Sequence, residues 1–299
     1  GQCGSCLQGC LANVKAGKGL GCIVNPEVGN ESHIERPADQ ERHVVVVGGG
    51  PAGLTAAIVT RRRGHRVTLL ERDELGGQFA LAPLAPGKAA MARPLNSLVR
   101  LACLSGADIR TGVEATTEMV ESLEPDVVVL ATGADPLTIP AYGLDGALTA
   151  DDVLTQTADT GSSVLIVGGG LVGIEVAEFL AERGKHVTVI ELLGDIARDM
   201  DTITRKLTLK RLEKFPIEIL TDTVLHSVDG CRALVRGPGD ERALGPFDSV
   251  VVAVGTRSNH DLAVPLMAKG LAVHVVGDAA ELEQIMGATR SAWEVACKI

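Results

Sequence analysis

The sequence predicts an α/β protein with two parallel β-sheets, each built on a strand–helix–strand unit that carries a glycine-rich turn. One observation is a continuous valine run at residues 44–47, which suits a parallel strand buried on both faces. The other is an internal repeat, because the same strand, glycines, helix and second strand return 120 residues later (168 − 48 and 191 − 71). A constant offset over a whole supersecondary unit indicates two domains of one kind.

The first unit holds three glycines in the spacing G-x-G-x-x-G: Gly48, Gly50 and Gly53. The first glycine permits a tight turn, the second lets phosphate approach the backbone, and the third lets helix and strand pack closely. A helix over residues 51–63 would hold a pyrophosphate at its positive N-terminal end. The strand at 67–70 is closed by Glu71, whose carboxylate can accept from ribose hydroxyls. These features together predict a Rossmann-like dinucleotide-binding domain, and the alternative is a glycine-rich turn without a nucleotide.

The second unit repeats the three glycines: Gly168, Gly170 and Gly173. Two such units in one chain suggest that two nucleotides meet. Glu191 closes the second strand of this unit, where a carboxylate accepts from the 2′-OH of NAD and repels a 2′-phosphate. NAD(H) is therefore favoured over NADP(H), with Lys185 and Arg198 as possible phosphate partners. An unused second site is the remaining alternative.

Composition sets outer bounds on the function. A chain of 299 residues can bury a substantial core and accommodate two domains. The net charge of −10 argues against nucleic acid as a partner, and the lack of a long apolar run predicts no membrane span. Four of the seven cysteines lie within the first 22 residues: Cys3, Cys6, Cys10 and Cys22. This clustering indicates a metal site in a reducing compartment, hence a cytoplasmic protein.

The cysteine spacing is C-x2-C-x3-C-x11-C. A close trio with one distant cysteine is a common way to supply the four thiolates of an iron–sulfur cluster. Zinc is the main alternative, although zinc sites favour two close cysteine pairs. A structural or disulfide role is the third. Cys103, Cys231 and Cys297 are expected to be buried small hydrophobes.

Several motifs carry a family resemblance. The cysteine trio, followed by Lys-Gly-Leu-Gly-Cys-Ile-Val-Asn-Pro at 18–26, resembles the iron–sulfur segment of one flavoenzyme family. That family includes bacterial 2,4-dienoyl-CoA reductase and trimethylamine dehydrogenase. The resemblance continues at five short motifs: residues 48–53, 75–79, 130–133, 253–259 and 275–279. Its members join an old-yellow-enzyme barrel carrying FMN, a four-cysteine [4Fe–4S] segment and a two-nucleotide module like glutathione reductase.

The resemblance implies a division of the chain. Residues 1–40 would bind the [4Fe–4S] cluster, residues 41–150 with 256–299 would bind FAD, and residues 151–255 would bind NAD(P). Beyond the first glycines and Glu71, it implies further contacts to FAD from Arg72, Gly77, Gln78, Gly133, Gly277 and Asp278. The alternative for Asp278 is a cap on the closing helix. Gly255, at the end of a strand in the second domain, is a further expected nucleotide contact.

The FMN barrel should precede the cysteines and is absent from this sequence. The expected partner is therefore an FMN-containing barrel domain or subunit, with this chain as a fragment or as one subunit of a hetero-oligomer. The predicted function is electron transfer between NAD(P)H, FAD, the [4Fe–4S] cluster and that barrel, without a catalytic side chain in this chain. Residues 76–87 lack the cysteine pair of glutathione-reductase-type enzymes, which excludes disulfide reduction. The alternatives are an amine-dehydrogenase-like module that holds the cluster and FAD or ADP without reacting with NAD(P)H, and a non-catalytic nucleotide-binding scaffold.

Overall fold

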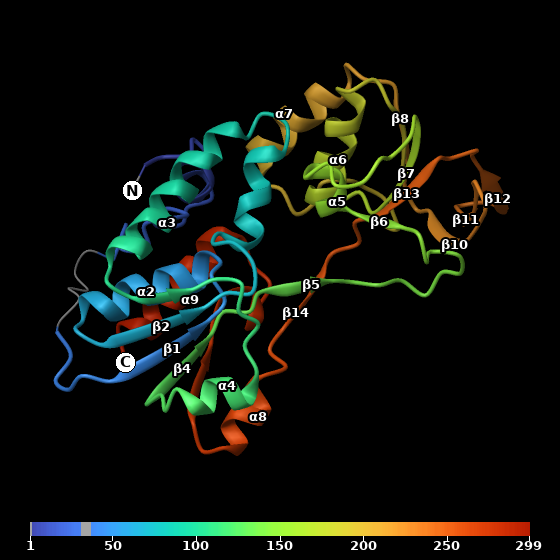
Figure 1. Ribbon diagram of the computed structural model, residues 1–299. Helices are drawn as coiled ribbons and strands as arrows, with labels where there is room; N and C mark the ends of the chain where they lie inside the picture. The colour runs from blue at the N-terminus through green and yellow to red at the C-terminus, as the bar shows by residue number, and fades with distance from the viewer. Residues whose placement is uncertain (1, 31–36) are drawn as a thin grey trace. The chain divides into compact units, whose positions relative to one another are not determined.

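A computed structural model describes residues 2–30 and 37–299 of the chain (Figure 1). The chain divides into two compact units. Unit 1 comprises residues 1–83, 90–135 and 257–299, and unit 2 comprises residues 84–89 and 136–256. Residues 136–150 thus belong to unit 2, whereas the sequence analysis assigned them to the first domain. Within the described ranges, no helix combines the length and the apolar character needed to cross a membrane.

Unit 1 is built on a parallel sheet of five strands, in the order β15-β4-β1-β2-β3. The strands are β1 His43–Val47, β2 Arg66–Leu70, β3 Asp108–Arg110, β4 Val127–Leu130 and β15 Ala272–Val275. Because β1 lies between β4 and β2, the strand order reverses at β1. The carboxyl ends of the strands at such a reversal are where open α/β sheets bind ligands.

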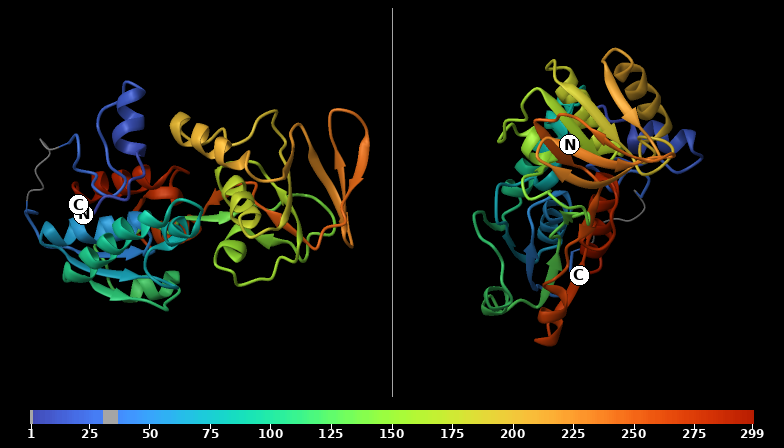
Figure 2. Two further views of the ribbon diagram at one scale, coloured as in Figure 1. Left: turned by 90° about the horizontal axis from the view of Figure 1, so that it is seen from above. Right: turned by 90° about the vertical axis from the view of Figure 1, so that its right-hand side faces the viewer.

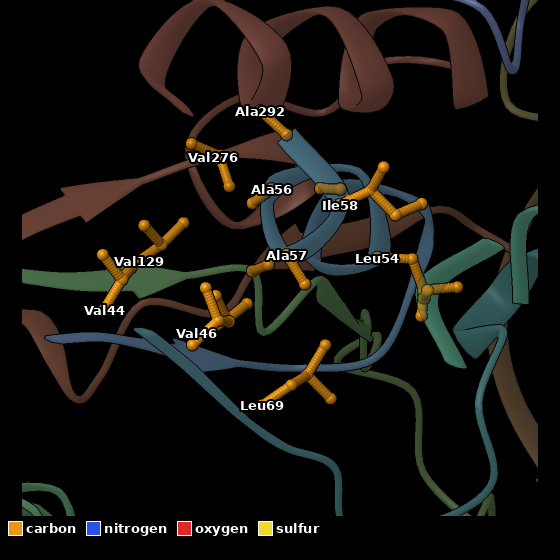
Figure 3. Packing of buried hydrophobic residues seen from close by; sticks show 14 of the residues in the cluster. Val44, Val46, Leu54, Ala56, Ala57, Ile58, Leu69, Val129, Val276 and Ala292 are labelled. Carbon is orange, nitrogen blue, oxygen red and sulfur yellow. The ribbon is translucent and has the colours of Figure 1, made fainter. Parts of the chain in front are cut away.

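Helices cover both faces of this sheet. One face packs against α2 Pro51–Arg62, α3 Ala92–Leu104 and α9 Ile285–Ala296, and the other packs against α4 Thr117–Ser122 and α8 Ala263–Ala268. Successive strand residues point to opposite faces, so Val44 and Val46 meet α2 and α9 while Val45 meets α4 and α8. Figure 3 shows the small side chains of α2, such as Ala57, that let the helix lie close to the strands.

Short irregular elements complete unit 1. They are η1 Gln8–Ala12 and α1 Asn13–Lys15 in the cysteine segment, η2 Gly77–Leu84, η3 Ala89–Met91, and η4 Gly277–Ala279 just before α9. The element η2 begins in the glycine pair that follows β2, and η4 follows β15. Both therefore lie at the carboxyl ends of strands, where a ligand is expected.

Unit 2 repeats this sheet with the strand order β6-β13-β7-β8-β9, again all parallel. The strands are β6 Leu148–Thr149, β7 Ser163–Val167, β8 His186–Ile190, β9 Ile217–Leu220 and β13 Ser249–Val252. One face packs against α5 Ala150–Leu154, α6 Leu171–Ala181 and α7 Thr202–Leu212. The other face is covered by an antiparallel meander of β10 Val224–Asp229, β11 Arg232–Arg236 and β12 Glu241–Leu244.

The chain passes from one unit to the other along β5 Ala134–Pro136 and returns along β14 Thr256–Ser258, and these two strands pair with each other. The predicted fold class is confirmed, since each unit has the parallel sheet and flanking helices of a Rossmann-like domain of glutathione-reductase type.

Candidate nucleotide and cluster sites

The glycine turns of the two units, residues 48–53 and 168–173, have nearly the same backbone geometry. The Gly48 N–H donates to the Leu70 carbonyl at 2.8 Å, and the Gly168 N–H donates to the Ile190 carbonyl at 2.9 Å. A Cβ on Gly53 would lie 1.8 Å from the Gly48 carbonyl oxygen. The same test on Gly173 gives 1.9 Å to the Gly168 oxygen. Backbone fills this space, so each third glycine is required by the close approach of helix and strand.

The two predicted acids brace these turns. Glu71 accepts from the Gly49 N–H at 2.5 Å with one oxygen and from the Asp73 N–H at 2.8 Å with the other. Glu191 accepts from the Gly169 N–H at 2.6 Å and from the Leu193 N–H at 2.8 Å. A carboxylate has about four lone-pair sites. Each acid can therefore hold its turn and still accept from ribose hydroxyls.

The loop after β2 lies against the first glycine turn. Gly77 has a positive φ of 52°, and a Cβ there would lie 3.0 Å from the Gly50 Cα. Gln78 is exposed and donates to the Ala134 carbonyl at 3.1 Å. Arg72 is exposed and pairs with Asp73 at 3.2 Å. Of these predicted residues, the structure brings Gly77 closest to the turn.

The predicted residues near the end of the chain also approach α2. Gly277 is buried, and a Cβ there would lie 2.8 Å from the Cβ of Ala52 in the first turn of α2. Its N–H donates to Ser291 Oγ of α9 at 3.0 Å. The first turn of α2 is thus approached by η4, as well as by the loop at Gly77. These surroundings fit the pyrophosphate and ribityl region expected for FAD.

Asp278 lies ahead of α9 rather than capping it, because the residue that precedes the helix is Gln284. Burial raises the pKa of the Asp278 carboxyl, and a hydrogen bond from the Glu283 N–H, at 3.1 Å, partly offsets that rise. Gly133 has a positive φ, and its carbonyl accepts from the Asn259 N–H at 2.9 Å.

The N-terminus of α6 carries a residue that sequence analysis missed. The Leu171 N–H donates to both oxygens of Asp199, at 2.8 and 3.0 Å. Gly170 directly precedes this helix. The predicted residue Gly255, near the end of unit 2, accepts with its carbonyl from the Leu137 N–H at 3.0 Å. The repeat marks the loop of Asp199 but not the acid, because the Gly76 N–H bonds the Gly49 carbonyl as the Ala197 N–H bonds the Gly169 carbonyl, which makes Asp199 equivalent to Gln78.

Helix α6 also buries two glutamates that sequence analysis did not single out. Glu175 forms an ion pair with Lys88, which belongs to the short segment 84–89 of unit 2. Burial raises the pKa of the Glu175 carboxyl, and Lys88 partly offsets that rise. Glu178 is 1% exposed, and its two oxygens accept from Arg211 Nε and Nη2 at 2.6 and 2.9 Å.

The four N-terminal cysteines share one neighbourhood. Burial raises the pKa of the Cys6 thiol, the Gln8 N–H lowers it, and Cys22, Cys10 and Cys3 raise it further. The Gly21 N–H donates to the Gly9 carbonyl at 2.7 Å, which ties the arm of Cys22 to that of Cys10. In the part of the chain that the structure describes, no three His, Cys, Asp or Glu side chains gather closely enough to hold a single metal ion.

The cysteine segment is attached to α9 (Figure 2, left). Thr289 Oγ1 donates to the Ile23 carbonyl at 3.0 Å in a buried contact. Met286, one turn earlier, lies against Gly9, where a Cβ would stand 2.7 Å from its sulfur. An apolar cluster beneath the segment includes four buried side chains: Ile23, Phe79, Met91 and Leu95. Helix α9 therefore contacts both the cysteine segment and η4.

Six cysteines are free thiols: Cys3, Cys6, Cys10, Cys22, Cys103 and Cys231. The prediction that Cys103 and Cys231 are buried is wrong, because both are exposed. Cys103 lies on the solvent side of α3, and Cys231 lies in the tight turn between β10 and β11. Cys297 is partly buried and packs against Val59 and Trp293.

The chain belongs to the pyridine nucleotide-disulphide oxidoreductase family, whose model matches residues 42–278. Within that class, the resemblance to the 2,4-dienoyl-CoA reductase and trimethylamine dehydrogenase family is confirmed by relatives and solved structures. NADH oxidase of Thermoanaerobacter brockii is 37% identical over 310 residues, which cover 100% of this chain and 48% of the relative. Bilirubin reductase of Mediterraneibacter gnavus is 35% identical over 284 residues, covering 94% of this chain and 44% of the relative.

A solved complex of 2-naphthoyl-CoA reductase with 2-naphthoyl-CoA matches with a TM-score of 0.92 at 29% identity, covering 99% of this chain and 46% of that one. The chain therefore spans about half the length of the relatives it matches. It is a flavin-dependent oxidoreductase module of the kind found in larger reductases, and the family supports binding of FAD and NAD(P).

Proposed function

We propose that this chain passes electrons between NAD(P)H, FAD and a [4Fe–4S] cluster, to or from an FMN-type barrel domain or subunit. The observation that carries the proposal is the attachment of the cysteine segment to α9. Thr289 of α9 holds Ile23, next to Cys22, and Ser291 of the same helix holds Gly277 beside α2. One rigid helix thus links the cluster ligands to the proposed flavin site.

The residues of unit 1 fit FAD. The first turn of α2 lies directly against the backbone of the glycine turn, since a Cβ on Gly53 would meet the Gly48 oxygen. Helix N–H groups at this end suit a pyrophosphate, and Glu71 retains lone pairs for the ribose. Arg72, Gly77, Gln78, Gly133 and Asp278 would complete the binding surface. No side chain in the chain is assigned a general acid or base role.

The four cysteines fit a cluster better than a single ion. A four-iron cluster is larger than one metal ion, so its thiolates stand further apart. Cys3, Cys10 and Cys22 are near enough to raise the pKa of Cys6, so the four thiols share one neighbourhood. Their spacing, C-x2-C-x3-C-x11-C, supports [4Fe–4S] over mononuclear zinc, which favours two close pairs. The cluster of four cysteines in the first 22 residues favours a reducing, cytoplasmic location.

When bound, FAD supplies the conversion of a hydride's electron pair into single electrons that a cluster can carry. The chain's own residues orient the nucleotides. In unit 2, Glu191 would accept from the 2′-OH of NAD(H) and repel the 2′-phosphate of NADP(H). Gly168, Gly170, Gly173 and Gly255 would lie along the nicotinamide nucleotide.

The test is an anaerobic absorbance titration of the as-isolated protein with NADH, and in parallel with NADPH. We expect flavin bands on a broad iron–sulfur shoulder, and both should bleach more readily with NADH. Cys6→Ala should lose most of the iron and the shoulder, because three thiolates hold a cluster poorly, while the flavin still bleaches. Cys103→Ala is the matched control and should keep its iron. Unchanged iron in Cys6→Ala, or a flavin that NADH does not reduce, would refute the proposal.

A second candidate function has one observation in its favour. Asp199 sits on the α6 N-terminus where a dinucleotide pyrophosphate would bind. If a pyrophosphate does not displace this carboxylate, NAD(P)H cannot bind unit 2, and the chain is an amine-dehydrogenase-like module that holds cluster and nucleotide without reacting with NAD(P)H. Iron–sulfur absorbance that persists unbleached under NADH would select this function. Loss of flavin with assembly of the complex retained would instead select a non-catalytic scaffold.

A further inference from the structure

We propose that Asp199 sets the affinity of unit 2 for dinucleotides, by holding the α6 N-terminus until a pyrophosphate displaces it. The inference rests on the proposed function, because it takes unit 2 to be the nicotinamide site. Asp199 lies outside the glycine turn and is distinct from Glu191, the acid proposed to bind the ribose. The expected ligand class is a nucleoside diphosphate joined to a second ribose.

The geometry places Asp199 on the helix end. Both of its oxygens accept from the Leu171 N–H, the first N–H of α6. A Cβ on Gly170 would lie 3.4 Å from the nearer oxygen. The carboxylate therefore covers both the residue that precedes the helix and its first N–H.

The loop that carries Asp199 is tied to the glycine turn. Two residues earlier, the Ala197 N–H donates to the Gly169 carbonyl at 2.7 Å. Ala197 is 1% exposed and has a φ of 52°, in the left-handed region that a residue with a Cβ rarely adopts. The surrounding packing holds this conformation, and it directs the following residues over the helix end.

Competition follows from the chemistry of a helix N-terminus. The first N–H groups have no partner within the helix, and the helix dipole favours a negative charge beside them. A carboxylate and a pyrophosphate satisfy the same groups, so one must leave when the other binds. Asp199 is also near enough to Glu175 to raise the pKa of that carboxyl. A pyrophosphate entering with Asp199 in place would thus add to existing negative charge.

Unit 1 lacks this device at the same repeat position. The Gly76 N–H donates to the Gly49 carbonyl at 2.9 Å, as the Ala197 N–H does to the Gly169 carbonyl, so the offset between the two loops is 121 here. Gln78 therefore stands in place of Asp199, and this exposed amide donates to the Ala134 carbonyl. A flavin stays bound through many turnovers, whereas a nicotinamide nucleotide must leave after each one. Because Asp199 can occupy the α6 N-terminus again, the nucleotide bound to unit 2 can leave more readily.

The test measures binding of ADP-ribose, which carries the pyrophosphate but cannot transfer a hydride, to the flavin-loaded protein by calorimetry. Asp199→Asn keeps the shape and removes the charge, and Asp199→Ala removes the acceptors as well. We expect affinity to rise about tenfold in the alanine variant, which corresponds to about 1.4 kcal/mol, and by a smaller factor in the asparagine variant. Asp240→Asn makes the same charge change in the exposed turn between β11 and β12 and should leave affinity unchanged.

Thermal melting of each variant establishes that the fold is retained. Unchanged or weaker ADP-ribose binding in both Asp199 variants would overturn the inference, as would an absence of binding in every form of the protein. Tighter binding in these variants, with a flavin that NADH does not reduce, would uphold the inference and refute the proposed electron entry. The two failures are therefore distinguishable.

Discussion

The two nucleotide units share one turn and differ in what surrounds the helix that follows it. In both, the glutamate at the end of the second strand accepts from the turn, at 2.5 Å in unit 1 and 2.6 Å in unit 2. Along the helices the agreement ends. Thr55 and Ile58 of α2 stand where α6 has Glu175 and Glu178 (175 − 55 and 178 − 58 both give 120).

This difference separates what the fold requires from what the function can vary. The turn is repeated because backbone meets backbone there and only glycine fits. The sides of the two helices, in contrast, pack against residues that differ between the units. Helix α2 is covered by apolar side chains of α9, such as Ala292, whereas α6 meets Lys88 and Arg211. Helix α2 is thus held by apolar packing, whereas helix α6 is held in part by ion pairs.

The largest effect should come from the third glycine of each turn. Gly53→Ala places a methyl group 1.8 Å from a backbone oxygen, so the turn must open, at a cost of about 3 kcal/mol or more. We expect this variant to lose FAD while still binding ADP-ribose. Gly173→Ala should do the reverse. Flavin absorbance after gel filtration and calorimetry with ADP-ribose measure the two losses separately.

Gly239→Ala serves as the control, because a Cβ there meets no atom within 4 Å. It should retain both ligands. Loss of FAD in Gly173→Ala but not in Gly53→Ala would reverse the assignment of the two units.

How much of this could be predicted from the sequence follows the same division. The strands, both turns, Glu71 and Glu191 were predictable, since each requirement lies within one short stretch of chain. The partner of Glu175 was not, because Lys88 lies 87 residues away in sequence. The contact of Thr289 with Ile23 likewise depends on how the finished unit packs. Asp199 lay in between, because the repeat marks its loop, but the offset changes there from 120 to 121 and unit 1 has no acid at the equivalent position.

A second prediction concerns the ion pair that replaces apolar packing in unit 2. Arg211→Met leaves Glu178, at 1% exposure, without its bidentate partner. Losing the partner of a buried charge costs about 3–5 kcal/mol, but Arg211 is 40% exposed and water screens the pair, so we expect about 2–3 kcal/mol. Urea unfolding followed by circular dichroism measures the loss.

The double variant Arg211→Met/Glu178→Ile gives unit 2 the isoleucine that unit 1 has at Ile58. Replacing a buried ion pair by apolar side chains is often neutral, so the double variant should recover most of the lost stability. A double variant as unstable as the single one would show that the two helices are not interchangeable at this position.

The smallest effect is a pH dependence that unit 1 should lack at the matching position, Thr55. Burial raises the pKa of Glu175 above its ordinary value of 4.5, with Lys88 offsetting part of the rise. The folded state then keeps a proton that the unfolded chain releases. Stability therefore falls as pH rises from 4.5 through the folded pKa, by at most about 1.4 kcal/mol per pH unit for one group.

Glu175→Gln removes this titration, so the unfolding free energies of the variant and the natural protein should diverge in the variant's favour as pH rises across that window. Urea unfolding at intervals from pH 4.5 to about 7.5 measures the divergence. Lys88→Met should move the window upward, because it removes the cation that favours the carboxylate. Parallel curves for the natural protein and Glu175→Gln would mean that Lys88 fully compensates the burial. The buried ion pair of α6 would then be as insensitive to pH as the apolar packing of α2.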